Sequence, residues 1–191
     1  MLHTILQVED DPNDVFLFEH AMRKVGVVNP IQVATDGQQA IDYLNGVGRF
    51  SDRKLFPLPC LVLLDLKLPY VMGLDVLKWI RGQTGTSRVV VLLSASGQET
   101  DIAAAYRLGA NGFLIKPSEA SKLQDIARSI RDYWLIQNTP PPEMSSQVPM
   151  EGTVSLEIAP ANFSTLSITR RGTDKPAGEL TTRNGRPKGG S

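Results

Sequence analysis

The chain has 191 residues, with 20 Lys and Arg balanced by 20 Asp and Glu, and a single cysteine, Cys60. Zero net charge gives no global field that would make nucleic acid or a membrane an obligatory partner. A lone cysteine excludes an intramolecular disulfide and fits a reducing compartment. We expect neither a leader nor a membrane span, because no charged start precedes a short apolar stretch with a cleavage site and no apolar run is long enough to cross a bilayer. We therefore expect a cytoplasmic protein of one domain with an extension, or of two small domains.

Short apolar runs alternate with segments of helical period from Leu2 to about Asn138. This alternation is typical of successive βα units on a parallel sheet. It predicts strands near residues 3–8, 31–34, 60–64, 88–93 and 112–115. It predicts helices near residues 12–25, 37–46, 73–81, 98–108 and 119–136. Right-handed crossovers then give an α/β three-layer sandwich over residues 1–137.

Local signals mark where the first and last helices begin. Asp11-Pro12 places proline near a first turn, and Ser118-Glu119 offers a cap followed by an early carboxylate. The stretch Gly46–Pro59 is longer than a usual connection between a helix and a strand. We predict that it forms an exposed excursion before the third strand.

Residues 138–191 differ in composition from the rest of the chain, because Pro, Gly, Ser and Thr recur to its end. Such a segment buries too little apolar surface to offset its ordering entropy, so we predict a disordered tail. Apolar residues alternate within Val154–Ile168, which leaves an induced hairpin or a docking strand open. The stretch Arg183–Lys188 loosely resembles a minor-groove hook, but its flanks depart from that pattern and favour a solvated basic tail.

Charged residues follow three of the predicted strands. Glu9 and Asp10 follow the first strand, Asp65 the third and Lys116 the fifth. Ligands bind at the carboxyl edge of open α/β sheets, so carboxylates and one ammonium should meet there. Taken alone, Asp65 could equally be a turn-forming residue; its companions favour a functional site.

Four groups of residues stand in the order and spacing of bacterial response-regulator receiver domains: Val8-Glu9-Asp10, Leu64–Pro69 with Gly73, Leu93-Ser94-Ala95, and Lys116-Pro117. The chain resembles this family over residues 2–137. It is most similar to single-domain receivers associated with phytochrome-type kinases, through the Gly46–Pro59 excursion and the segment Tyr106–Asn111. The resemblance implies a flavodoxin-like fold with five parallel strands in the order 2-1-3-4-5.

The resemblance also implies roles at the acceptor and at the metal. Asp65 would be the phospho-acceptor, forming an acyl phosphate with a phosphoryl group from a sensor histidine kinase or a phosphotransfer protein. Glu9, Asp10, Asp65 and the backbone carbonyl of Lys67 would hold Mg²⁺, which prefers oxygen ligands. Asp11 is better explained as a helix-start residue.

Three further residues take their implied roles from the same family. Lys116 would pair with Asp65 at rest and with a phosphoryl oxygen afterwards, and the Lys116–Pro117 bond would be cis. The Ser94 hydroxyl would donate to the phosphoryl group, although a strand-end serine bonded to local backbone would have the same sequence. Phe113 would be the switching aromatic, although a core aromatic would look identical.

These features predict a two-component response regulator that switches partner binding and assists only its own phosphorylation and dephosphorylation. The rival hypothesis is an effector whose tail is the phosphorylation-controlled output, binding nucleic acid or a peptide. A Mg²⁺ phosphohydrolase is weaker, because Asp65-Leu66-Lys67 lacks a second acid. The sequence identifies no downstream partner and leaves a homodimer open.

Overall fold

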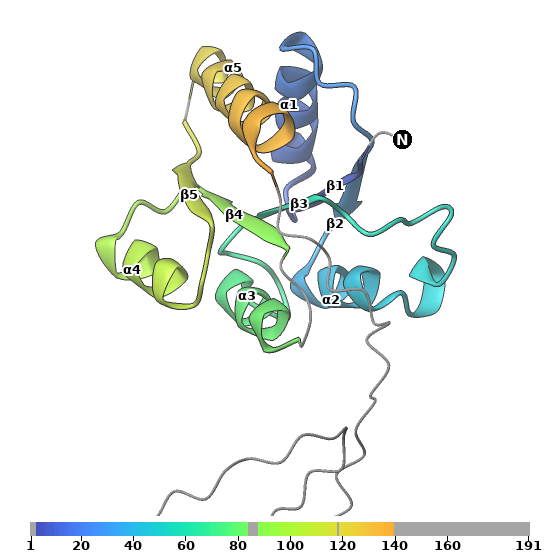
Figure 1. The fold of residues 1–191 in the computed structure, drawn as a ribbon. Helices are drawn as coiled ribbons and strands as arrows, with labels where there is room; N and C mark the ends of the chain where they lie inside the picture. The colour runs from blue at the N-terminus through green and yellow to red at the C-terminus, as the bar shows by residue number, and fades with distance from the viewer. Residues whose placement is uncertain (1–2, 84–87, 118, 140–191) are drawn as a thin grey trace, which may run out of the picture. The chain divides into compact units, whose positions relative to one another are not determined.

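A computed structural model describes residues 3–83, 88–117 and 119–139 (Figure 1). Its strands form one parallel sheet in the order β2-β1-β3-β4-β5, which confirms the predicted order. The five strands are β1 (Ile5–Val8), β2 (Ile31–Ala34), β3 (Leu61–Leu64), β4 (Val89–Ser94) and β5 (Gly112–Ile115).

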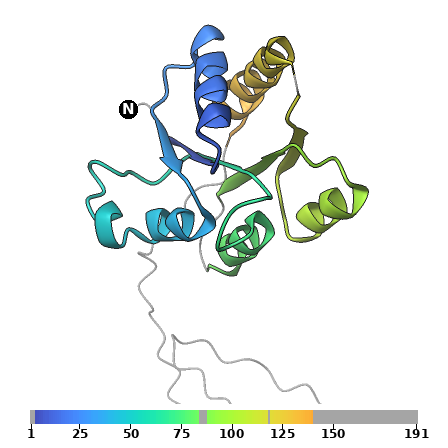
Figure 2. The ribbon, with the colours of Figure 1, turned by 180° about the vertical axis from the view of Figure 1, so that it is seen from behind.

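Helices cover both faces of this sheet and complete the predicted three layers. Helices α1 and α5 lie on one face, and α2, α3 and α4 lie on the other (Figures 1 and 2). The helices are α1 (Pro12–Lys24), α2 (Gly37–Asn45), α3 (Gly73–Gly82), α4 (Glu99–Arg107) and α5 (Ala120–Ser129). The predicted last helix, 119–136, is not one regular helix, because from Ile130 to Gln137 it continues as a π-helix with wider hydrogen-bonded turns.

The sheet separates two apolar cores, because its central strands carry apolar side chains on both faces. On β1, Ile5 packs in the core that includes Phe18 and Met22 of α1, whereas Leu6 packs in the core that includes Val76 and Leu77 of α3. All residues of β3 and β4 are buried. Burial on both faces explains why these strands are continuous apolar runs instead of alternating ones.

The predicted start of α1 is confirmed in detail. The Asp11 carboxylate caps the helix by accepting a hydrogen bond of 2.8 Å from the backbone N–H of Asn13, and Pro12 is the first helical residue. The corresponding prediction for α5 rests on Ser118, which lies outside the described residues. Because α1 starts at Pro12, Glu9 and Asp10 remain in the short connection between β1 and the helix.

The expectation that Gly46–Pro59 is an exposed excursion holds for most of the segment, but Phe50 and Pro59 are buried. The segment contains a 3₁₀ turn, Gly48–Phe50, and Phe50 is buried against Phe56, with ring centroids 5.2 Å apart. Arg53 folds back onto α2 and donates hydrogen bonds to the carbonyl oxygens of Tyr43 at 2.7 Å and Leu44 at 2.8 Å. Aromatic burial and helix capping therefore hold a segment whose length alone suggested solvent exposure.

A second arginine connects elements at the opposite edge of the sheet from the predicted site. Arg81, at the end of α3, donates hydrogen bonds to the backbone carbonyl oxygens of Gly109 at 2.8 Å and Arg88 at 2.9 Å. It also donates to the side-chain oxygen of Asn111 at 2.7 Å. The connections that lead into β4 and β5 are thereby held by one guanidinium.

No helix within the described ranges is both long and apolar enough to cross a membrane. The predictions of disorder and of an alternating apolar patch in the tail concern residues that, from 140 onward, lie outside the described ranges.

Candidate functional site

The sheet register brings the predicted site residues to one edge. Val8 of β1 pairs with Leu64 of β3, so Glu9 and Asp65 follow neighbouring strands at the same level. Ser94 ends β4 and pairs with Ile115, which Lys116 follows directly. These four residues come from sequence positions that are far apart, and they meet because the four strands are parallel and adjacent.

Three carboxylates lie close enough to share one cation. Oxygen atoms of Glu9, Asp10 and Asp65 all lie within 4.8 Å of one another. Glu9 and Asp65 are only 4% and 8% exposed, whereas Asp10 is exposed. Burial raises the pKa of Glu9, and the bond to Lys116 opposes that effect. An all-oxygen donor set with an exposed side suits Mg²⁺, which keeps part of its hydration shell.

The Lys116 ammonium lies among three carboxylates. Its Nζ donates to Glu9 in the shortest contact, to Asp14 Oδ2 at 2.9 Å and to Asp65 Oδ2 at 3.4 Å. Burial alone would lower the pKa of Lys116, but the bonds to Glu9 and Asp14 raise it above its ordinary value. The predicted pair with Asp65 is present, but it is the longest of the three contacts.

Sequence reasoning missed Asp14. The available signal was its position in the first turn of α1, four residues after Asp10. That signal predicts only a favourable interaction with the helix dipole, and it says nothing about Lys116, which is 102 residues away in the sequence.

The Asp65 side chain is oriented by its own loop. Its Oδ1 accepts a hydrogen bond of 2.6 Å from the backbone N–H of Leu66, and the Leu66 carbonyl accepts one of 3.0 Å from Gly73. A Cβ atom at Gly73 would lie 2.0 Å from the Asp65 carbonyl oxygen. Only a glycine lets α3 begin this close to the acceptor backbone.

Ser94 is 1% exposed, and its hydroxyl oxygen accepts a long hydrogen bond of 3.4 Å from the backbone N–H of Ser96. This is the local contact expected of a strand-end serine, but an accepting hydroxyl still has its own hydrogen to donate. The Ser94 carbonyl accepts a hydrogen bond of 2.8 Å from the Lys116 backbone N–H, which ties the ends of β4 and β5 together.

Phe113 is half-buried and lies three residues before Lys116 on β5. It packs against the core on the α2, α3 and α4 face. This position suits both a core aromatic and a switching aromatic, so the role that we assigned to Phe113 stays a prediction. The same holds for the Lys67 carbonyl as a metal ligand.

The expectation of a cis Lys116–Pro117 bond is wrong, because the described residues contain no cis peptide bond. Trans is the lower-energy form of an X–Pro bond by about 0.5–1 kcal/mol. With this trans bond, the Lys116 ammonium already reaches the carboxylates.

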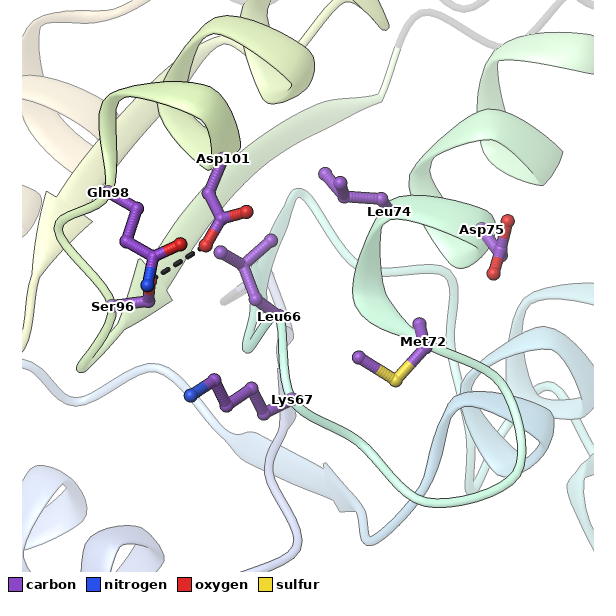
Figure 3. Close-up of a pocket in the computed structure, with 8 residues that line it drawn as sticks. All are labelled: Leu66, Lys67, Met72, Leu74, Asp75, Ser96, Gln98 and Asp101. Carbon is purple, nitrogen blue, oxygen red and sulfur yellow. Dashed lines mark hydrogen bonds between the residues drawn. The ribbon is translucent and has the colours of Figure 1, made fainter.

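A hollow of about 510 Å³ lies beside the acceptor loop (Figure 3). Ser96, Gln98 and Asp101 line one side, and the Ser96 hydroxyl donates a hydrogen bond of 2.7 Å to Asp101. Met72, Leu74 and Asp75 line the other side, with Leu66 between the two groups. The hollow thus lies between the loop after β3 and the loop after β4, and both loops adjoin the site.

Comparison with known proteins identifies the family. Residues 5–128 match the response regulator receiver domain. The chain belongs to the response-regulator receiver family. As a receiver domain, it is part of a two-component response regulator, which is a signalling protein. These matches do not favour the rival hypothesis of an effector whose tail is the phosphorylation-controlled output.

Two curated relatives have similar lengths to this receiver. Probable methanogenesis regulatory protein FilR2 of Methanothrix harundinacea is 36% identical over 141 residues, which is 72% of this chain and 86% of the relative. Response regulator Rcp1 of Synechocystis is 32% identical over 132 residues, which is 69% of this chain and 88% of the relative.

Solved structures confirm the similarity of the receiver to phytochrome-associated response regulators. The phosphorylated cyanobacterial phytochrome response regulator RcpA superposes with a TM-score of 0.69 at 32% identity, covering 74% of this chain and 99% of RcpA. RPA3017, of red-light signalling in R. palustris, gives a TM-score of 0.70 at 31% identity, covering 73% and 99%. The Mn²⁺-bound form of Rcp1 gives 0.66 at 31% identity, covering 73% and 99%.

Proposed function

We propose that Asp65 accepts a phosphoryl group from a phosphohistidine of a sensor histidine kinase or a phosphotransfer protein. The observation that carries this proposal is the convergence of Glu9, Asp10, Asp65 and Lys116 at one edge of the sheet. Carboxylates in such a cluster repel one another, so a cluster that had only a structural role would be costly. The phosphorylated state of the similar protein RcpA supports the same chemistry here.

Glu9, Asp10, Asp65 and the Lys67 carbonyl would hold the divalent cation. When bound, Mg²⁺ neutralises charge on the phosphoryl oxygens and on the carboxylates around them. The Mn²⁺-bound form of Rcp1 supports a divalent cation in a receiver of this kind. Asp10 is the exposed member of the three, so its carboxylate can meet an incoming hydrated ion first.

The two carboxylate oxygens of Asp65 have different surroundings, which suggests how the transfer proceeds. The Leu66 N–H holds Oδ1, whereas Oδ2 lies toward Lys116. In our proposal Oδ2 attacks phosphorus, and an O–P bond forms as the P–N bond to the donor histidine breaks. The histidine leaves with the electron pair of that bond, as a neutral imidazole whose other ring nitrogen carries the proton. Lys116 and the Ser94 hydroxyl then donate hydrogen bonds to the phosphoryl oxygens, in charge-assisted contacts.

The added charge would act on partners through Ser94 and Phe113. A phosphoryl group that draws the Ser94 hydroxyl toward it would change the conformation at the end of β4. The end of β5 would respond, because the Lys116 N–H is hydrogen-bonded to the Ser94 carbonyl. Similarity to RcpA and RPA3017 favours a phytochrome-type kinase as the donor, and the single cysteine fits the reducing cytoplasm. The identity of the downstream partner is not part of this proposal.

The acceptor assignment can be tested with acetyl phosphate and Mg²⁺, followed by intact-protein mass spectrometry. Wild type should gain one acid-stable, base-labile phosphoryl group, and Asp65→Asn should gain none. Asp75→Asn is a matched control, because Asp75 is an exposed acid near the site that takes no part in the proposed chemistry. Full labelling of Asp65→Asn would show that another residue is the acceptor.

The metal assignment needs a separate measurement. Asp10→Ala should weaken Mg²⁺ binding in isothermal titration, because it removes one of three carboxylates within reach of the cation. The same change relieves repulsion among the acids, so the metal-free protein should be at least as stable as wild type. Equal Mg²⁺ affinities in the two proteins would place Asp10 outside the metal site.

A further inference from the structure

Asp14 contacts the site but has no part in the chemistry proposed above. It lies in the first turn of α1, and its Oδ2 accepts a hydrogen bond of 2.9 Å from Lys116 Nζ. This distance is shorter than the 3.4 Å between Lys116 Nζ and Asp65 Oδ2. The lysine that must serve the acceptor is therefore bonded more closely to a carboxylate of another element.

The three carboxylates use the full donor capacity of Lys116. An ammonium has three N–H donors, and Glu9, Asp14 and Asp65 each accept from this one. A donor that moves to a phosphoryl oxygen must leave one of these partners. Asp14 is the most exposed of the three, with 41% of its side chain accessible compared with 4% for Glu9 and 10% for Asp65. Its carboxylate can be solvated by water once the lysine leaves, so it loses least.

We propose that Asp14 is a positioning residue, which holds the Lys116 ammonium on the α1 side of the acceptor before phosphorylation and releases it to the phosphoryl group afterwards. This inference rests on the proposed role of Asp65 as the acceptor. The contact between Asp14 and Lys116 then stabilises the unphosphorylated arrangement relative to the phosphorylated one. This stabilisation is lost when a stronger acceptor of hydrogen bonds occupies Asp65.

The α1 helix dipole offers a simpler role for Asp14, and the chain provides a matched control for it. Asp14 is the third residue of α1, and Asp75 is the third residue of α3, which also begins at this edge of the sheet. Both acids interact favourably with a helix N-terminus. None of the ion pairs in the described part of the chain involves Asp75, so Asp75→Asn reproduces the loss of charge without the loss of a lysine contact.

The expected effect is an increase in the apparent affinity for a phosphoryl mimic. A half-exposed ion pair has a modest free energy, which corresponds to about two- to fivefold in an equilibrium. Asp14→Asn should therefore bind beryllofluoride in the presence of Mg²⁺ about two- to fivefold more tightly than wild type. Asp75→Asn should match wild type, and Asp14→Glu should restore most of the wild-type value, because it keeps a carboxylate within reach.

The test combines these titrations with NMR of the lysine side chains, labelled with ¹⁵N at Nζ. In the unphosphorylated protein, Asp14→Asn should shift the Lys116 ammonium signal and Asp75→Asn should not. In a Lys116→Met background, Asp14→Asn should no longer change beryllofluoride affinity, because the effect passes through the lysine. An equal gain in that background would assign the effect to direct repulsion between Asp14 and the anion, and would overturn the proposal.

An unshifted Lys116 signal in Asp14→Asn would also overturn the proposal, whatever the affinities show. Failure of the underlying function gives a different result. If Asp65 is not the acceptor, wild type will bind no beryllofluoride there, while the NMR shift of Lys116 in unphosphorylated Asp14→Asn remains. The two failures are therefore distinguishable in one set of samples.

Discussion

Replacing Gly73 by alanine should separate helix propensity from the packing of the acceptor loop. Alanine is favoured over glycine in a helix by up to about 1 kcal/mol, so propensity alone predicts a gain in stability. At this position, however, the new Cβ would lie 2.0 Å from the Asp65 carbonyl oxygen and 2.9 Å from Leu66 Cα. Real Cβ atoms essentially never approach closer than 3.0 Å, so the backbone must move by about 1 Å. Overpacking of this kind costs about 1–3 kcal/mol, which exceeds the gain.

The displaced atoms belong to the acceptor, so Gly73→Ala should also slow phosphorylation by acetyl phosphate. Gly82→Ala is the control in the same helix, because a Cβ there would meet nothing within 4 Å. Urea unfolding, with the midpoint compared at constant m-value, should show Gly73→Ala destabilised and Gly82→Ala unchanged or stabilised by up to about 1 kcal/mol. A Gly73→Ala protein that matches wild type in midpoint and phosphorylation rate would refute the steric argument.

Three further outcomes can be measured on the same protein. Arg53→Ala should lose about 1–3 kcal/mol of unfolding free energy, because carbonyl groups at the end of α2 lose a charged donor. Arg49, whose guanidinium lies over the Phe50 ring, is the comparison, and Arg49→Ala should lose less than about 1 kcal/mol. Burial raises the pKa of the Cys60 thiol, so less thiolate is present near neutral pH and iodoacetamide should react more slowly with native than with urea-unfolded protein; equal rates would contradict its burial. A chain ending at residue 139 should keep the unfolding midpoint and the phosphorylation of the full chain, since all described elements lie before that residue; loss of cooperative unfolding would show that the tail packs on the receiver.

The fold followed from local patterns because each strand is a short apolar run bounded by polar or turn-forming residues. The order of the strands came from the family resemblance, since apolar runs such as Leu61–Leu64 do not specify their neighbours. The convergence of Glu9, Asp65 and Lys116 was predictable from the general rule that parallel strands present their carboxyl ends at one edge.

What the sequence did not predict depends on contacts between distant segments. The Asp14 contact requires α1 to pass beside the end of β5, which no local pattern encodes. The length of Gly46–Pro59 suggested exposure, so the burial of Phe50 and the capping of α2 by Arg53 were not predicted. The aromatic residues inside this long connection were a usable signal of burial. The trans Lys116–Pro117 bond corrects an expectation drawn from the family and not from these residues.

The hydrogen bonds of Arg81 have a mechanical consequence for signalling. They fix the entrances of β4 and β5 at the edge far from Asp65, through Arg88, Gly109 and Asn111. Ser94 and Lys116 lie at the other ends of the same two strands. We therefore expect Arg81 to anchor the ends of β4 and β5 that lie away from Asp65, so that any change in these strands on phosphorylation is confined to the end that carries Ser94 and Lys116.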